Sequence, residues 1–205
     1  LNSLIKYYQA GQYVDAEKMS VSISQEFPRH QFAWKVLAAV LKQTGRISES
    51  LIATQKSVQL EPQDSEAHYN LGVVLKELER LNEAEASYRK AITLKPDFTG
   101  AHYNLGVLLK ELERLNEAEA SYRKAITLKP NYAETHNNLG VTLKTLGKLN
   151  EAEASYRKAI TLKPNYAEAH NNLGVTLKTL GKLNEAEASY RKAITLKPNY
   201  AEAHN

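Results

Sequence analysis

Apolar residues along the chain recur with the spacing of an α-helix. Leu71, Leu75 and Leu78 fall at i, i+4 and i+7, which places them on one face of a helix. A second stripe of this kind follows a break at 79–80 and consists of Ala84, Tyr88, Ala91 and Ile92. No segment alternates polar and apolar residues for long, so the pattern does not favour strands. It predicts two helices joined by a short turn.

Candidate helix ends lie between the stripes. Gly147 and Gly181 stand at the break in later copies of the pattern, and glycine suits the left-handed residue that follows a helix C-terminus. Asn82, with Glu85 three residues later, fits a side-chain cap on the first turn of the second helix. The same pair recurs at Asn116/Glu119, Asn150/Glu153 and Asn184/Glu187, and between hairpins at Asn131/Glu134 and Asn165/Glu168. We therefore expect asparagine caps at both kinds of helix start.

The two-helix pattern repeats with a fixed period. All six prolines lie 34 residues apart, at Pro28, Pro62, Pro96, Pro130, Pro164 and Pro198. Five of the six histidines keep the same interval, at His68, His102, His136, His170 and His204. This period indicates stacked helical hairpins, because one hairpin cannot bury its own apolar face. We expect a single solenoid, 1–205, made of a partial divergent repeat 1–30, full repeats 31–64, 65–98, 99–132, 133–166 and 167–200, and the start of a truncated repeat, 201–205.

The residues within one period resemble a known family. The positions that match the tetratricopeptide repeat (TPR) pattern are Leu71-Gly72, Leu75, Ala84, Tyr88, Ala91 and Pro96, with His68 where the family has a tryptophan. Block 31–64 supplies that tryptophan as Trp34. The repeats are most similar to the TPR arm of O-linked GlcNAc transferases and to bacterial TPR proteins. The resemblance implies an all-α, right-handed superhelical solenoid of helix-turn-helix repeats, whose first helices line a concave groove.

Small residues stand where the two helices of a hairpin must cross closely. Gly72, Ala84 and Ala91 leave room for close helix packing, and Leu75 and Tyr88 are expected to fill the remaining space. A buried tyrosine at this position needs a hydrogen-bond partner for its hydroxyl.

Composition narrows the function classes. The 205 residues carry 27 basic and 23 acidic side chains, for a net charge of +4, which is too mild to favour nucleic acid as a partner. The absence of cysteine excludes a disulfide scaffold and fits a reducing compartment, so we expect a cytoplasmic protein. No run of 18 apolar residues is present, and we expect no membrane association.

Neither a metal site nor an active site is predicted. Histidines of successive repeats would lie about 10 Å apart, which is too far to share a zinc ion with ligands at about 2.0–2.1 Å; we interpret them as packing residues. The chain has no phosphate loop, HExxH motif or nucleophile elbow. Glu85 and Arg89, four residues apart, are expected to form an ion pair on the helix surface. We expect no enzymatic activity and no cofactor.

A polar stripe on the first helix of each repeat is the candidate binding surface. In one repeat it consists of Glu66, Tyr69, Asn70, Val73 and Lys76, whose spacing keeps them on a face that the leucines do not occupy. Stacking in register would align the asparagines into a ladder, namely Asn70, Asn104, Asn138 and Asn172. A similar ladder in the GlcNAc-transferase arm holds the backbone of an extended polypeptide. An amide offers both a donor and an acceptor, so it can pair with a peptide unit of any sequence.

Other residues flank this ladder. A basic row that favours acidic or carboxylate-bearing partners comprises Lys42, Lys76, Lys110, Lys144 and Lys178. Further contacts are expected from Tyr69, Tyr103, Asn137 and Asn171. Block 65–98 has a net charge of −1 and block 133–166 of +2, so an acidic ligand should prefer the C-terminal half. The alternative is that these polar residues only face water. The family's clamp for C-terminal carboxylates is not expected, because it needs an asparagine where Val73, Val107, Val141 and Val175 stand.

Three function classes follow. The first is a scaffold for protein–protein interaction that holds an extended, acidic polypeptide in its groove. The second is the substrate-presenting arm of a larger glycosyltransferase-type enzyme, with more repeats or a catalytic domain after residue 205. The third is a self-associating array, because the apolar side of the last hairpin around Leu183, Ala186 and Tyr190 is expected to lack a polar cap.

Overall fold

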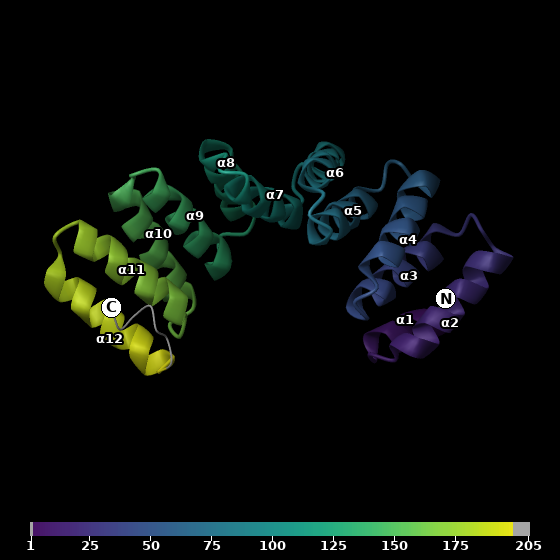
Figure 1. Ribbon diagram of the computed structural model, residues 1–205, viewed down its shortest axis with the longest axis horizontal. Coiled ribbons are helices and arrows are strands. Elements are labelled where there is room, and N and C mark those ends of the chain that lie inside the picture. The colour runs from purple at the N-terminus through teal and green to yellow at the C-terminus, as the bar shows by residue number, and fades with distance from the viewer. Residues whose placement is uncertain (1, 199–205) are drawn as a thin grey trace. The chain divides into compact units, whose positions relative to one another are not determined.

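The computed structural model describes residues 2–198, and these form an all-α array of paired antiparallel helices. The helices are α1 (Asn2–Gln9), α2 (Tyr13–Glu26), α3 (Gln31–Gln43), α4 (Ile47–Leu60), α5 (Ser65–Glu77), α6 (Leu81–Leu94), α7 (Thr99–Glu111), α8 (Leu115–Leu128), α9 (Ala133–Thr145), α10 (Leu149–Leu162), α11 (Ala167–Thr179) and α12 (Leu183–Leu196). Figure 1 shows the hairpins in chain order. The predicted fold class is confirmed.

The chain divides into two compact units, one up to Ala101 and one from His102 onward. Within the first unit α1 contacts α3, and within the second α9 contacts α11. First helices of consecutive repeats therefore lie side by side in each unit, as stacked hairpins require. The boundary falls inside α7, and the single continuous solenoid stays a prediction. The truncated repeat predicted at 201–205, with His204, lies outside the described residues.

The close approach between the two helices of a hairpin is confirmed. A Cβ atom added to Gly72 would lie 2.7 Å from ring carbons of Tyr88, and one added to Gly140 would lie 2.6 Å from Cε1 of Tyr156. Tyr88 and Tyr156 are at most 1% exposed, and Ala84 and Ala91 are 0% exposed. Each ring therefore packs directly on the backbone of the facing helix, at a distance that only glycine allows.

The buried tyrosine hydroxyls differ from expectation. Within the described residues, the hydroxyl oxygens of Tyr122 and Tyr156 have no hydrogen-bond partner. Burial also raises the pKa of both phenols above its usual value. Both rings are therefore held by packing alone.

The turn between the helices needs a left-handed residue. Gly147 and Gly181 adopt φ of +75° and +76°, as predicted. In the two preceding repeats Glu79 and Glu113 occupy the same place with φ of 57° and 58°. A side chain with a Cβ atom is strained in this region, so these two turns store conformational energy that the glycine turns do not.

The expected asparagine caps are wrong. Helix α6 begins at Leu81, one residue before Asn82, and its N-cap residue is Arg80, which makes no side-chain cap hydrogen bond. Likewise α9 begins after Tyr132 and α11 after Tyr166, so Asn131 and Asn165 lie outside the helices. The carboxylate of Asp64 does cap α5, because its Oδ1 accepts from the backbone N–H of Glu66 at 2.8 Å and of Ala67 at 3.3 Å.

No helix in residues 2–198 is long and apolar enough to cross a membrane.

Candidate functional site

The predicted asparagine ladder lies on the first helices and is solvent-accessible. Asn70 on α5 is exposed, and Asn104, Asn138 and Asn172 on α7, α9 and α11 are partly buried. In each unit, we call the surface that its first helices present around these asparagines the first-helix face of that unit. Asn70 belongs to the first unit and the other three belong to the second. Asn104, Asn138 and Asn172 therefore lie on first helices of the same unit.

Two ladder asparagines each use one N–H group to bridge to the preceding repeat. Asn138 Nδ2 donates to the Tyr103 hydroxyl at 3.1 Å, and Asn172 Nδ2 donates to Asn137 Oδ1 at 3.2 Å. An asparagine side chain has two N–H donors and a carbonyl acceptor. Asn138 and Asn172 therefore each keep one N–H and the Oδ1 atom for a ligand.

Asn137 and Asn171 do not lie on the accessible surface, which corrects the expectation that they contact a ligand. Asn137 is 1% exposed and Asn171 is 4% exposed. Asn137 Nδ2 donates to Glu168 Oε1 at 3.0 Å, and its Oδ1 accepts from Asn172. These contacts assign Asn137 a role in joining successive repeats and in holding Asn172 in place. The Oδ1 atom of Asn171 has no partner among the described residues.

Tyr69 and Tyr103 pack mainly into aromatic clusters. The Tyr69 ring lies 4.9 Å from the Phe98 ring and 6.1 Å from the Tyr88 ring, centroid to centroid. Tyr103 lies 5.2 Å from Tyr132 and 6.1 Å from Tyr122 in the same arrangement. Both tyrosines are partly buried. Burial raises the pKa of the Tyr103 hydroxyl above its usual value.

The lysine row differs between the two units. Lys42 Nζ lies 3.2 Å from Glu77 Oε1 in the next repeat, and Lys76 lies in the last turn of α5. The residue that follows Lys110 and Lys144 by the same 35 positions is a threonine, at 145 and 179. Among the described residues, no carboxylate lies within ion-pairing distance of Lys110, Lys144 and Lys178. Lys110, Lys144 and Lys178, unpaired within the described residues, therefore add positive charge to helices that also carry Glu134 and Glu168.

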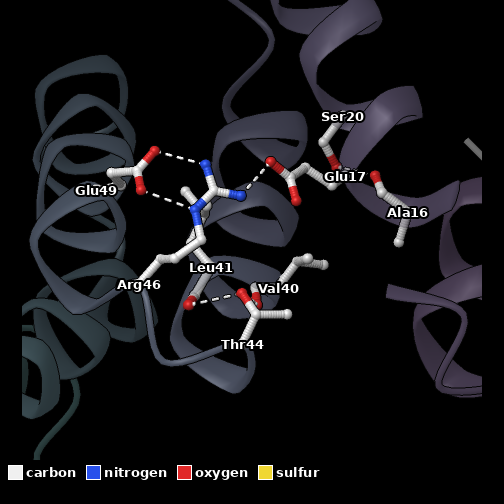
Figure 2. A network of polar contacts seen from close by, with 8 residues as sticks. All are labelled: Ala16, Glu17, Ser20, Val40, Leu41, Thr44, Arg46 and Glu49. Atoms are coloured by element: carbon white, nitrogen blue, oxygen red, sulfur yellow. Dashed lines mark hydrogen bonds and ion pairs between the residues drawn. The ribbon is translucent and has the colours of Figure 1, made fainter. Parts of the chain in front are cut away.

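On the second helices, several glutamates have basic partners. Glu119, 9% exposed, accepts from Arg123 at 2.9 Å and from Lys148 of the next repeat at 2.8 Å. Glu153 is held in the same way by Arg157 and Lys182. Figure 2 shows the related contact in the first unit, where the Arg46 guanidinium lies between the carboxylates of Glu17 and Glu49. The predicted ion pair of Glu85 with Arg89 is confirmed at 2.8 Å.

The histidine row serves the joints between hairpins. Nε2 of His68, His136 and His170 lies 2.9–3.0 Å from the carbonyl oxygen of the proline six residues earlier. Trp34 Nε1 donates to the Pro28 carbonyl at 3.1 Å in the same way. Each ring therefore provides a hydrogen-bond partner for the carbonyl oxygen of the proline that follows the preceding helix. The constant spacing of six residues between the proline and the ring is the sequence signal of this contact. No group of metal-ligating side chains was found among residues 2–198.

Fold and face together define a helical-repeat protein with a polar, partly basic surface on its first helices. A family description, "TPR repeat", matches residues 108–147 and 142–181, and another, "Tetratricopeptide repeat", matches 65–98 and 167–200. The chain belongs to the tetratricopeptide repeat family. Neither description is of a catalytic domain. A search of curated protein sequences gave no match.

Solved structures with a similar fold include bacterial TPR proteins. YrrB, described as a TPR protein with an unusual peptide-binding site, has a TM-score of 0.80 and 24% identity over 92% of this chain and 97% of its own. PilF of Pseudomonas aeruginosa has a TM-score of 0.86 and 18% identity over 99% of this chain and 92% of its own. MamA of Desulfovibrio magneticus RS-1 has a TM-score of 0.77 and 20% identity over 83% of this chain and 97% of its own. At these identities the likeness extends to the fold alone.

Proposed function

We propose that the chain is a protein-interaction scaffold that binds an extended, acidic polypeptide along its first-helix face. Two features that occur together in the second unit carry the proposal. The side-chain amides of Asn138 and Asn172 keep hydrogen-bonding groups for a ligand, and the lysines of the same helices have no carboxylate partner among the described residues. YrrB is a relative in fold whose description includes a peptide-binding site, which supports the same class of ligand.

The spacing of the helices suits a polypeptide backbone. Packed helices lie about 8–10 Å apart, and an extended chain advances about 3.3 Å per residue. An asparagine from each repeat then meets about every third peptide unit of the ligand. Amide-to-backbone contacts tolerate many side chains, and the lysines Lys110, Lys144 and Lys178 add a preference for negative charge.

The test is the affinity of an Asp- and Glu-rich extended peptide, measured by fluorescence anisotropy. Replacing Asn138 and Asn172 together by alanine removes two peptide contacts. We expect the affinity to fall by a factor between about 5 and about 150, since each hydrogen bond contributes about 0.5–1.5 kcal/mol. The matched control replaces Asn150 and Asn184, exposed asparagines on the second helices. Equal affinities for the two double variants would refute the assignment of the face.

The charge preference has its own test. Lys144→Gln with Lys178→Gln is expected to weaken binding of the acidic peptide and to reduce its sensitivity to salt. Lys158→Gln with Lys192→Gln is the control, because these exposed lysines occupy the same position on α10 and α12 and make no ion pair among the described residues. A salt dependence that both pairs of substitutions reduce equally would contradict a role for the lysine row.

A second candidate function, association of two copies of the chain, is favoured by one apolar side chain. Leu183 on α12 is 64% exposed, whereas its equivalents Leu115 and Leu149 are partly buried. Covering Leu183 with a second molecule would remove apolar surface from water. Sedimentation velocity at increasing concentration tests this candidate: Leu183→Ser should abolish dimers that the unaltered chain forms, and an unaltered chain that stays monomeric would reject it.

A further inference from the structure

Repeat 31–64 lacks an aromatic cluster that its neighbour contains. In repeat 65–98 the rings of Tyr69, Tyr88 and Phe98 pack together. The residues 34 positions earlier are Lys35, Thr54 and Asp64. Lys35 Nζ lies 3.0 Å from Asp64 Oδ2, so an ion pair replaces two of the rings and a threonine replaces the third.

The lost tyrosine ring is not replaced by other atoms. In repeat 65–98 the Tyr88 ring lies on Gly72, and the equivalent pair in repeat 31–64 is Ala38 and Thr54. One methyl group is added and one phenol ring is removed. A cavity of about 220 Å³ lies at this place, lined by Ala38, Thr54, Ser57, Ala67, Asn70 and Val74 among others. All of them belong to the first unit.

The wall of the cavity carries a buried hydroxyl that no group in the described residues satisfies. Ser57 is 1% exposed, and its Oγ atom has no hydrogen-bond partner there. The neighbouring hydroxyls are engaged, since Ser50 Oγ donates to the Ala38 carbonyl at 2.8 Å and Thr54 Oγ1 donates to the Ser50 carbonyl at 2.7 Å. The later repeats have alanine where Ser57 stands, at 91, 125, 159 and 193. Compared with repeat 65–98, repeat 31–64 therefore lacks a tyrosine ring at position 54 and has an additional hydroxyl at position 57 without a hydrogen-bond partner among the described residues.

The cavity opens onto the first-helix face. Gln43 and Asn70 line it and are exposed, whereas Thr54, Ser57 and Val74 line it and are buried. Asn70 is the ladder asparagine of this unit. A polypeptide held along the face by Asn70 would therefore pass the mouth of the cavity.

We propose that this cavity is a specificity pocket that receives one aromatic side chain of the bound polypeptide, with tyrosine preferred over phenylalanine. The inference rests on the peptide-binding function proposed above and adds side-chain selectivity to it. The volume of 220 Å³ is larger than the about 150 Å³ of a cavity that holds benzene, so it accommodates a phenol ring. The lining is mixed, because Tyr8, Lys35 and Lys42 also contribute to it. The Ser57 hydroxyl is the group that distinguishes a phenol from a phenyl ring, because it can pair with the ligand hydroxyl.

The first experiment uses the side-chain analogues p-cresol and toluene as probes. Both are titrated into the intact chain, and the methyl NMR signals of Ala38, Ala67 and Val74 are followed. We expect saturable shifts, with p-cresol bound more tightly than toluene. Ser57→Ala, which copies the other repeats, should remove the preference for p-cresol and leave toluene binding intact. Absence of saturable shifts with either probe would overturn the proposal.

A filled variant provides the control. Ala38→Gly with Thr54→Tyr restores the pair found in repeat 65–98, so the chain should fold and should lose binding of both probes. Circular dichroism checks the fold. Probe binding that persists unchanged in the folded, filled variant would place the probes elsewhere and overturn the proposal.

Peptide binding separates this inference from the proposed function. An acidic peptide with one central tyrosine should bind the unaltered chain at least about tenfold more tightly than the same peptide with alanine there, from the area that an aromatic ring buries. The filled variant should abolish this difference. Equal binding of the two peptides would overturn the pocket and leave the scaffold function standing. Saturable binding of p-cresol with no binding of any peptide would instead overturn the scaffold function, and with it this inference.

Discussion

The contact of Gly140 with Tyr156 allows a quantitative prediction about how the hairpins hold together. A Cβ atom at Gly140 would lie 2.6 Å, 2.8 Å and 2.9 Å from three ring carbons of Tyr156. The shortest of these is about 0.8 Å inside the 3.4 Å at which ordinary contact begins (3.4 − 2.6). Because the ring is 0% exposed, it has no room to retreat. Gly140→Ala therefore forces the two helices apart.

The expected cost follows from two opposing terms. Overpacking of a closed core costs about 1–3 kcal/mol, and three ring atoms in contact place this case near about 3 kcal/mol. Alanine is favoured over glycine inside a helix by about 1 kcal/mol. Gly140→Ala should therefore lower the free energy of unfolding by about 2 kcal/mol. In a Tyr156→Thr background the clash is absent, and the same substitution should raise it by about 1 kcal/mol. The coupling between the two positions is then about 3 kcal/mol.

Urea unfolding followed by circular dichroism measures these free energies, analysed as a nearest-neighbour array because repeat proteins need not unfold in one step. Gly147→Ala is the control: it has no atom within 4 Å of its added Cβ but a φ of +75°. It should cost about 1–2 kcal/mol in both backgrounds. Equal costs of Gly140→Ala with and without the tyrosine ring would refute the close approach.

Three further predictions concern single side chains. Glu113 has a φ of 58°, which glycine adopts without strain, so Glu113→Gly should raise the free energy of unfolding by about 1 kcal/mol. Gly147→Glu should lower the free energy of unfolding by a similar amount in the same urea assay. Tyr156→Phe should leave stability unchanged or raise it by up to about 1 kcal/mol, since the buried hydroxyl has no partner among the described residues; a loss of 1 kcal/mol or more would show that it has one. Burial alone would raise the pKa of Glu119, but hydrogen bonds from Lys148 and Arg123 outweigh it and lower the pKa. Because its pKa is lowered, Glu119 stabilises the fold at pH values above the ordinary carboxyl pKa of 4.5. This stabilisation is lost as the pH falls through the lowered pKa. The melting temperature should therefore depend less steeply on pH below 4.5 in Glu119→Gln than in the unaltered chain.

The repeated pattern was sufficient to predict the hairpins and their closest contact. Gly72 and Tyr88 recur at fixed positions, and only a close crossing explains a glycine in the middle of a helix opposite a large ring. The helix starts were less predictable. The N-cap residue of α6 is Arg80, two residues before the predicted cap Asn82. Composition alone does not locate a helix start to within two residues.

The placement of the candidate residues on the helices was predicted in part. Spacing placed the ladder asparagines on the first helices, but it assigned Asn137 to the ligand side, although the position is filled by tyrosine in two earlier repeats and faces the joint between repeats. The change from tyrosine at positions 69 and 103 to asparagine at 137 and 171 was the available signal of a half-buried environment. The cavity beside Thr54 was not predictable from periodicity, because it results from side chains that a divergent repeat lacks.

The most direct test of the account is a ¹⁵N NMR titration of the side-chain amide groups with the acidic peptide. The account predicts that the Nδ2 signals of Asn138 and Asn172 shift and saturate with the peptide, while those of Asn150 and Asn184 on the second helices stay in place. Shifts confined to Asn150 and Asn184 would show that the ligand binds the opposite surface and would contradict the account.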